Sequence, residues 1–166
     1  MTEPAEIVLY PAPLFAQAAT TRPVDEALQS IGTRLLSTAQ YHRAYGLAAT
    51  HIGHAEPVVV VSFGPLQGRD YRVLFNPEIL RSSAETEPGA EGSVSLPGIE
   101  VDIVRARSIV LAYDDAEGAR HEISLSGFPA RVAQHEIDQM NGVFFLDRLS
   151  RLKRDAALRR YRKLAR

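Results

Sequence analysis

The segment Gln134-His135-Glu136-Ile137-Asp138-Gln139 decides which fold and which chemistry this sequence suggests. Apolar residues recur around it at three- and four-residue spacing, from Val132 to Met140, which predicts a helix. Side chains four residues apart share one helix face, so the pattern His-Glu-x-x-His can hold zinc or iron while its Glu moves protons. Here the fifth position is Gln139 instead of histidine. By itself, the segment is therefore weak evidence for a metal site.

The rest of the pattern predicts one α+β domain that spans residues 1–166, because strand patterns and helix patterns do not alternate as βαβ units. Asp25 is expected to cap a helix that runs to about Tyr41, and Ser126 is expected to cap the helix carrying His135, which Gly142 ends. Strands are expected at residues 58–63, 71–75 and 79–81, with a hairpin over 107–113 and 121–125.

Charge is unevenly distributed along the 166 residues. Residues 147–166 hold nine Lys or Arg and two acids, a net charge of +7; the remainder has ten basic and eighteen acidic residues, a net charge of −8. A basic helix is expected over about residues 147–165, with an inner face of Leu149, Leu152, Ala156 and Leu164. Such a helix is either a docking surface for an anionic partner or an ordinary solvated face.

Composition excludes several classes of chemistry. The chain has no cysteine, so it can form neither a disulfide nor a thiolate metal ligand nor a cysteine nucleophile. No apolar run is long enough to span a bilayer, and the first ten residues lack the features of a signal peptide. We therefore expect a cytoplasmic protein with neither a membrane nor DNA as its partner.

Two further segments give the first segment more weight as evidence. They are Gly46-Leu47-Ala48-Ala49-Thr50-His51 and Glu91-Gly92-Ser93-Val94-Ser95-Leu96-Pro97-Gly98. In order and spacing, the three segments together resemble the three signature motifs of peptide deformylases, which are Gly-x-Gly-Leu-Ala-Ala-x-Gln, Glu-Gly-Cys-Leu-Ser and Gln-His-Glu-x-Asp-His. The resemblance covers about residues 7–163. An unrelated fold would have to explain three ordered matches by coincidence.

The resemblance implies a fold of mostly antiparallel sheets packed around a central helix carrying His135 and Glu136, plus a C-terminal helix. It also implies an activity: deformylases remove the N-formyl group from the first methionine of new bacterial proteins, using a metal held by one Cys and two His.

Residue by residue, only part of that site carries over. His135 matches the first His ligand, Glu136 the general base, Val94 the residue whose backbone N–H stabilises the oxyanion, and Glu91 the supporting motif Glu. The positions implied to bind substrate are Gly46, Tyr45, Val132 and Glu91. Asp138 is expected to form a structural ion pair with Arg105.

The sequence departs from the family pattern at the positions that carry the chemistry. Ser93 replaces the Cys ligand, Gln139 replaces the second His ligand, and His51 replaces the oxyanion Gln. A neutral hydroxyl and a carboxamide are poor substitutes for a thiolate and an imidazole on iron or zinc. Near Glu100, the family often has an arginine that contacts peptide, which would reverse the local charge.

Two functions from different classes follow. The first is a deformylase-like protein whose standard activity is lost or severely reduced, which needs no metal and keeps peptide binding or ribosome binding through the basic C-terminal helix. The second is an active hydrolase of N-formylmethionyl peptides or another amide. Its one divalent metal (Fe²⁺, Zn²⁺ or Ni²⁺) would sit in a relocated site of His51 and His135, completed by Glu136, Ser93 or water. In the first case, the exchange of His and Gln at positions 51 and 139 is drift in an unused site.

Overall fold

A computed structural model describes residues 2–166. The helices are α1 (Glu26–His42), α2 (Phe128–Met140) and α3 (Arg151–Leu164), with 3-10 turns η1 (Pro13–Ala16), η2 (Ala49–Ile52) and η3 (Phe145–Arg148). The strands are β1 (Gly46–Ala48), β2 (Val58–Ser62), β3 (Tyr71–Ser82), β4 (Thr86–Gly92), β5 (Glu100–Ala106), β6 (Ser108–Asp114) and β7 (Arg120–Ser126).

The core is built around a five-stranded antiparallel sheet of order β1-β2-β3-β6-β7. Side chains alternate between the two faces of a strand, and β2 buries both of its faces. Val58 and Val60 pack with Leu28 and Leu35 of α1. Val59 and Val61 pack in the cluster that contains α2. The sheet therefore lies between α1 and α2.

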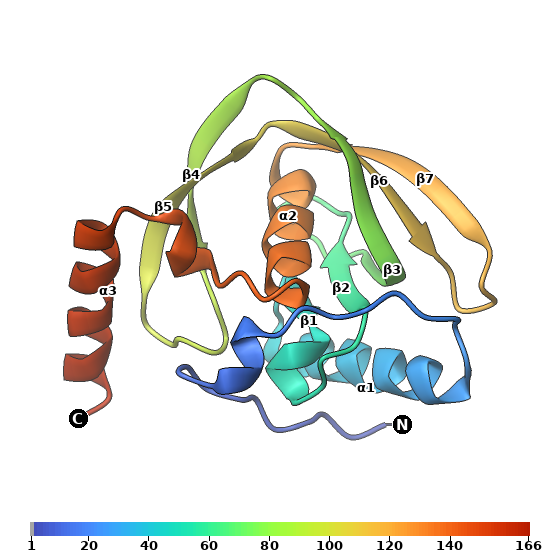
Figure 1. Cartoon of the computed structure of the whole chain (residues 1–166), viewed down its shortest axis with the longest axis horizontal. Coiled ribbons are helices and arrows are strands. Elements are labelled where there is room, and N and C mark those ends of the chain that lie inside the picture. Colours follow the sequence, from blue (N-terminus) through green and yellow to red (C-terminus); the bar gives the residue numbers. More distant parts are fainter. Residues whose placement is uncertain (1) are drawn as a thin grey trace.

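A second, two-stranded sheet pairs β4 with β5 and lies on the other side of α2. Figure 1 shows α2 in the middle of the molecule, between this ribbon and the larger sheet. Ile103 of β5 packs with Phe145 and with Ala157 of α3. The expected arrangement of antiparallel sheets around a central helix, with a C-terminal helix, is confirmed.

Some element boundaries differ from the sequence expectations. The two strands expected at 71–75 and 79–81 form the single strand β3, which passes through Asn76-Pro77 with shifts in its register to β6. Asn76 has a left-handed φ of 48°, and its side chain bonds Arg22 and Asp114, which holds this irregular point in place. The strands β4 and β5 were not expected from the sequence.

The helix ends also bring corrections. Asp25 caps α1 as expected, since its carboxylate accepts a hydrogen bond from Leu28 N–H at 2.9 Å. Ser126 does not cap α2, because it still pairs with Ser108 in the β6–β7 ladder. Gly127 takes the cap position instead, with a φ of 66° that favours glycine.

The final helix begins later than expected. Asp147 lies in η3, and Ser150 caps α3 by accepting a hydrogen bond from Lys153 N–H. Leu152 and Leu164, expected on its inner face, are 76% and 61% exposed. The face that packs is instead formed by Ala157, Leu158 and Tyr161.

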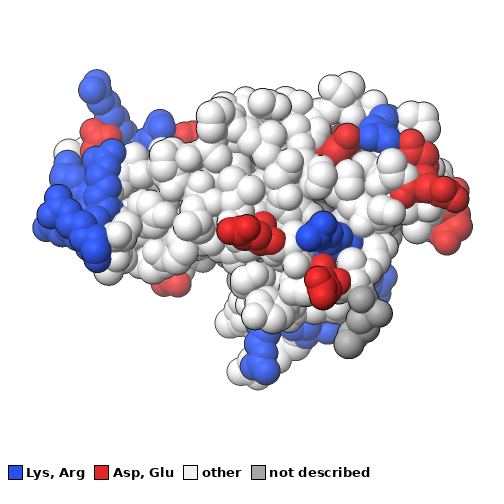
Figure 2. Space-filling view, turned by 90° about the horizontal axis from the view of Figure 1, so that it is seen from below, with Lys and Arg blue, Asp and Glu red and all other residues white. Residues whose placement is uncertain are grey.

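The exposed side of α3 is strongly basic. Figure 2 shows Lys and Arg gathered at the end of the molecule where α3 lies, while acidic side chains gather at the opposite end. Within residues 2–166, no helix is both long and apolar enough to cross a membrane.

Candidate functional site

A cleft of about 700 Å³ lies between β1, β4 and α2. It brings together every site residue expected from the sequence except one. The residues that line it are Tyr45, Gly46, His51, Glu91, Ser93, Val94, Val132, His135 and Glu136. Gln139 is buried behind them at 1% exposure, where its amide nitrogen lies 3.4 Å from Thr50 Oγ1. Segments distant in the sequence therefore converge as the resemblance implies.

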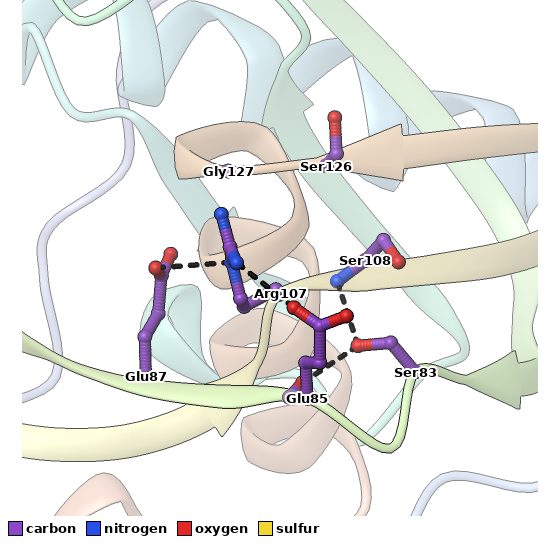
Figure 3. Close-up of a pocket in the computed structure, with 7 residues that line it drawn as sticks. All are labelled: Ser83, Glu85, Glu87, Arg107, Ser108, Ser126 and Gly127. Carbon is purple, nitrogen blue, oxygen red and sulfur yellow. Dashed lines mark hydrogen bonds and ion pairs between the residues drawn. The ribbon is translucent and has the colours of Figure 1, made fainter.

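A smaller hollow of about 460 Å³ lies where β4, β6 and β7 come together (Figure 3). Arg107 is its cation, and this guanidinium already pairs with Glu85 at 2.9 Å and Glu87 at 3.4 Å. Because its one cation is already paired with both of its carboxylates, the hollow offers less chemistry than the larger cleft.

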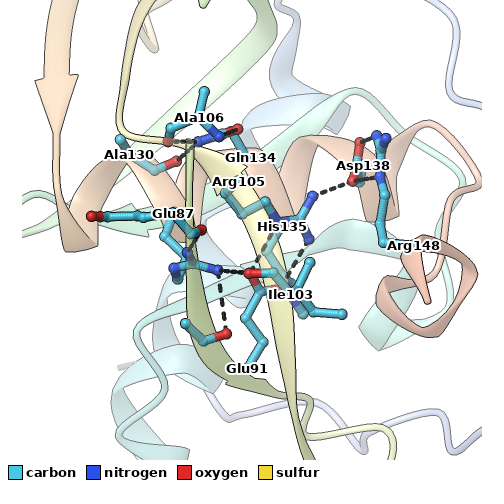
Figure 4. Close-up of polar contacts among 12 residues, drawn as sticks. Glu87, Glu91, Ile103, Arg105, Ala106, Ala130, Gln134, His135, Asp138 and Arg148 are labelled. Atoms are coloured by element: carbon cyan, nitrogen blue, oxygen red, sulfur yellow. Dashed lines mark hydrogen bonds and ion pairs between the residues drawn. The ribbon is translucent and has the colours of Figure 1, made fainter. Parts of the chain in front are cut away.

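Glu91 is the centre of a buried polar network behind the cleft (Figure 4). Its carboxylate accepts two hydrogen bonds of 2.9 Å from Arg105, one of 2.7 Å from Arg131 and one of 2.8 Å from His135 Nδ1. Burial by itself would raise the pKa of Glu91, but the bonds from Arg105 and His135 outweigh it and lower the pKa to about 2. Glu91 is therefore an anion that orients its neighbours.

The network continues to the surface through Asp138. Arg105 also bonds Asp138, which confirms the ion pair expected from the sequence. Arg148 adds hydrogen bonds of 2.9 and 2.7 Å to the same carboxylate.

Arg131 was missed from the sequence. It bonds the backbone oxygens of Ile103 and Glu87, at 2.7 and 2.8 Å, in addition to Glu91. It lies four residues before His135, so the helical period that placed His135 on the site face also places Arg131 there.

The hydrogen bond to Glu91 sets the tautomer of His135. Nδ1 faces a carboxylate and therefore carries a proton, so in the neutral ring the Nε2 lone pair is free. Burial lowers the pKa of His135, but the Glu136 and Glu91 carboxylates outweigh it and raise the pKa above its usual value. This is the orientation of a metal-binding histidine supported by a carboxylate.

His51 has the opposite tautomer. Its Nδ1 accepts a hydrogen bond from Ala48 N–H at 2.9 Å, so the proton lies on Nε2. Burial, with a contribution from His135, lowers the pKa of His51 to about 3, and the ring is neutral. His51 therefore offers an N–H donor rather than a lone pair. It also forms no true ion pair with Glu136, although Nδ1 and Oε1 are 3.8 Å apart.

Glu136 is buried at 4% exposure and is packed tightly against Gly46. A Cβ at position 46 would lie only 2.8 Å from Glu136 Oε2 and 2.7 Å from Val132, so this close approach requires glycine. Burial raises the pKa of Glu136 to about 7. A carboxyl with that pKa can take up and release a proton near neutral pH.

The loop after β4 holds Ser93 and Val94 at the cleft. Ser93 Oγ accepts a hydrogen bond from Ser95 N–H at 3.1 Å. Ser95 in turn bonds Val8 and Tyr10, so the N-terminal segment fastens this loop. Ser93 therefore presents a neutral hydroxyl in a local turn.

The three metal positions implied by the resemblance thus hold one imidazole, one hydroxyl and one carboxamide. His51 cannot serve as a further ligand through Nε2 in its present tautomer, because this nitrogen carries a proton where a metal needs a lone pair. Within residues 2–166, no group of three or more His, Cys, Asp or Glu side chains is arranged to hold a metal ion. The residues therefore do not fit the iron or zinc site of a standard deformylase.

Three buried polar atoms near this place lack a hydrogen-bond partner in the described part of the chain: His51 Nε2, Glu136 Oε1 and Gln139 Oε1. Buried polar atoms are usually paired with protein or water. One donor and two oxygens can satisfy a water molecule or a polar group of a ligand.

The other end of the cleft is apolar. Tyr45, Leu66, Phe128 and Val132 line it, and Tyr45 packs edge-on against Phe128 with ring centroids 4.7 Å apart. Arg69 lies 3.7 Å from the centre of the Tyr45 ring, and the Tyr45 hydroxyl donates to Leu66 O at 2.8 Å. These contacts fix the wall of a pocket that can receive an apolar side chain.

Comparisons with known proteins agree with this fold. The family model described as polypeptide deformylase matches residues 4–155. A protein of Brucella melitensis named peptide deformylase-like is 38% identical over 161 residues, which cover 96% of this chain and 97% of that protein.

Solved structures show the same likeness. The peptide deformylase of Ehrlichia chaffeensis in complex with actinonin has a TM-score of 0.90 and 30% identity, covering 100% of this chain and 99% of the other. The Met-Ala-Ser-bound class I type b peptide deformylase of Acinetobacter baumannii has a TM-score of 0.83 and 26% identity, covering 90% and 100%. The chain belongs to the peptide deformylase family.

Proposed function

We propose that this chain binds the N-terminal part of methionine-starting peptides and has lost, or nearly lost, the metal-dependent removal of the formyl group. The observation that carries the proposal is the donor set: His135 alone offers an imidazole lone pair, beside the Ser93 hydroxyl and the Gln139 carboxamide. Such a set binds iron or zinc far more weakly than a thiolate with two imidazoles.

Peptide binding is supported by two free strand edges. β1 is an edge strand of the large sheet, and among residues 2–166 β4 pairs only with β5. Both edges border the cleft, through Gly46 on one side and Gly89–Gly92 on the other. An extended peptide can add to such edges by backbone hydrogen bonds while its first side chain enters the apolar end. The related A. baumannii structure was solved with Met-Ala-Ser bound, and this supports the same ligand class here.

The test measures metal content and turnover on the same sample. Protein purified after growth with added iron and zinc is expected to hold no stoichiometric metal. It is expected to hydrolyse N-formyl-Met-Ala-Ser far more slowly than the A. baumannii deformylase, with Fe²⁺, Ni²⁺ or Zn²⁺ supplied. Calorimetry should nevertheless detect binding of the peptide. Turnover equal to that of the active relative would end the proposal.

A second candidate is an active hydrolase, favoured by one observation: Glu136 is retained, buried, and has a pKa raised to about 7. In this candidate, Glu136 serves as the proton carrier. A relocated site of His51 and His135 would require His51 to move its proton to Nδ1 and give up the hydrogen bond from Ala48. Stoichiometric metal in the wild type that disappears in His51→Ala would favour this candidate.

Ribosome docking through α3 is a separate part of the proposal. The basic side chains of α3 are Arg151, Lys153, Arg154, Arg159, Arg160, Arg162 and Lys163, and only Arg154 has an ion pair, with Asp147 at 3.3 Å, in the described part of the chain. Contacts with RNA phosphates weaken steeply as salt rises. Co-sedimentation with ribosomes should therefore fall with salt, and in a variant with Arg159, Arg160 and Lys163 changed to Gln. Co-sedimentation that is absent or insensitive to salt would reject docking.

A further inference from the structure

Glu100 is an uncompensated charge in the cleft. It is the first residue of β5, it is exposed, and it lines the cleft. In the part of the chain that the structure describes, residues 2–166, its carboxylate has no ion-pair partner. The other fixed anion of the cleft, Glu91, is neutralised by Arg105 and Arg131.

The register of the small sheet places Glu100 relative to the expected peptide path. Glu100 pairs with Gly92, which has no side chain to cover it. Gly92 belongs to the edge of β4, Gly89–Gly92, that borders the cleft and that an extended peptide would join. Glu100 therefore lies beside the proposed peptide path, within reach of the side chains that follow the first residue.

We infer that Glu100 gives the cleft a preference for peptides with lysine or arginine at the second or third position. This rests on the proposed peptide binding and adds the class of peptide. The carboxylate is exposed, so an ion pair with the peptide stabilises the complex modestly and is screened by salt.

The experiment uses three peptides that differ only in charge: N-formyl-Met-Lys-Lys, N-formyl-Met-Ser-Ser and N-formyl-Met-Glu-Glu, each with an amidated C-terminus. The formyl and amide groups remove the terminal charges, so only the side chains differ. At low salt, the full chain should bind the Lys peptide about fivefold more tightly than the Ser peptide, and the Glu peptide most weakly. The preference should shrink in about 1 M salt, where the screening length falls to about 3 Å.

Variants assign the preference to one residue. Glu100→Gln should remove the difference between the Lys and Ser peptides, and Glu100→Arg should reverse the order. Glu117→Gln, the same change in the exposed β6–β7 turn, is the matched control and should keep the wild-type order.

The outcomes separate this inference from the proposed function. If none of the three peptides binds, the proposed peptide binding fails and the inference fails with it. If all three bind equally, peptide binding stands and the preference is refuted. A Lys preference that survives in Glu100→Gln also overturns the assignment, because another group must then cause it.

Discussion

Two parts of the same cleft differ in how well their polar atoms are paired. Around Glu91, the carboxylate has four hydrogen bonds, and Arg105, Arg131 and Asp138 extend the network to the surface. Where a deformylase would hold its metal, His51 Nε2, Glu136 Oε1 and Gln139 Oε1 are buried without partners among residues 2–166. Buried atoms of this kind cost about 1–3 kcal/mol each unless water or a ligand satisfies them.

The Glu91 network and the residues around His51 and Glu136 therefore have separate physical roles. The Glu91 network holds α2 against β4 and β5, so it stabilises the fold whatever the cleft does. Ser93 and His51 line the cleft, and Gln139 is buried behind it, outside the Glu91 network. Substitutions at Ser93 and Gln139 should therefore change what the cleft binds while the Glu91 network still holds the fold.

The largest expected effect comes from restoring the ligands. The double variant Ser93→Cys/Gln139→His supplies a thiolate and a second imidazole beside His135, whose orientation by Glu91 is already in place. We expect stoichiometric iron or zinc and a gain of at least about 100-fold in deformylase kcat/KM, since even outer groups of such sites change activity by about 10–100-fold.

The single variants are the controls for this prediction, because each still lacks one ligand. Metal analysis and the formyl-peptide assay check it. A folded double variant without metal would show that the cleft differs from a deformylase in more than its ligands.

The next effect tests the supporting network. Arg105→Met removes a buried guanidinium that pairs with the buried Glu91 and the partly buried Asp138. Glu91 keeps Arg131 and His135, and Asp138 keeps Arg148, so the loss of the Arg105 hydrogen bonds is expected to lower the free energy of unfolding by about 1.5–3 kcal/mol. Arg148→Met is the matched control, since Arg148 is about half exposed and its loss should cost no more than about 1 kcal/mol. Urea unfolding measures both, and equal losses would contradict the distinction between the two regions.

The smallest effect concerns the pH dependence of stability. The pKa of His51 is about 3 in the folded chain, against an ordinary value of 6.5 for an exposed histidine, so the unfolded chain binds the proton first as the pH falls. The contribution of His51 to stability is full above pH 6.5 and is lost as the pH falls toward 3, by at most about 1.4 kcal/mol per unit. Glu136 acts oppositely, because its raised pKa adds stability as the pH falls from about 7 to 4.5.

The measurement is therefore a difference between wild type and His51→Gln, which keeps an amide donor but cannot titrate. Between pH 7 and pH 5, the unfolding free energy should fall more, or rise less, in the wild type than in the variant. Identical changes in both proteins would mean that His51 is not held neutral by burial.

Local patterns in the sequence predicted part of the fold well. The Asp25 cap, the hairpin of β6 and β7 and the helix carrying His135 all depend on neighbours within a few residues. The ribbon of β4 and β5 was missed, since Pro88 and Gly89 disfavour a strand when read alone. The signal that could have found it is the alternation of Val101, Ile103 and Arg105 toward one face of β5.

By itself, the sequence determined which chemical groups are present: one motif histidine, its neighbouring Glu136, and Ser93 and Gln139 where metal ligands are expected. Only the tertiary structure decided how those groups act. The proton position on His51 depends on the N–H of Ala48, and the proton position on His135 depends on the Glu91 carboxylate of β4. Whether the Glu100 carboxylate is available to a ligand depends on its place at the edge of the cleft. Hydrogen bonding and burial are set by contacts between residues that are distant in the sequence, so motif spacing cannot predict them.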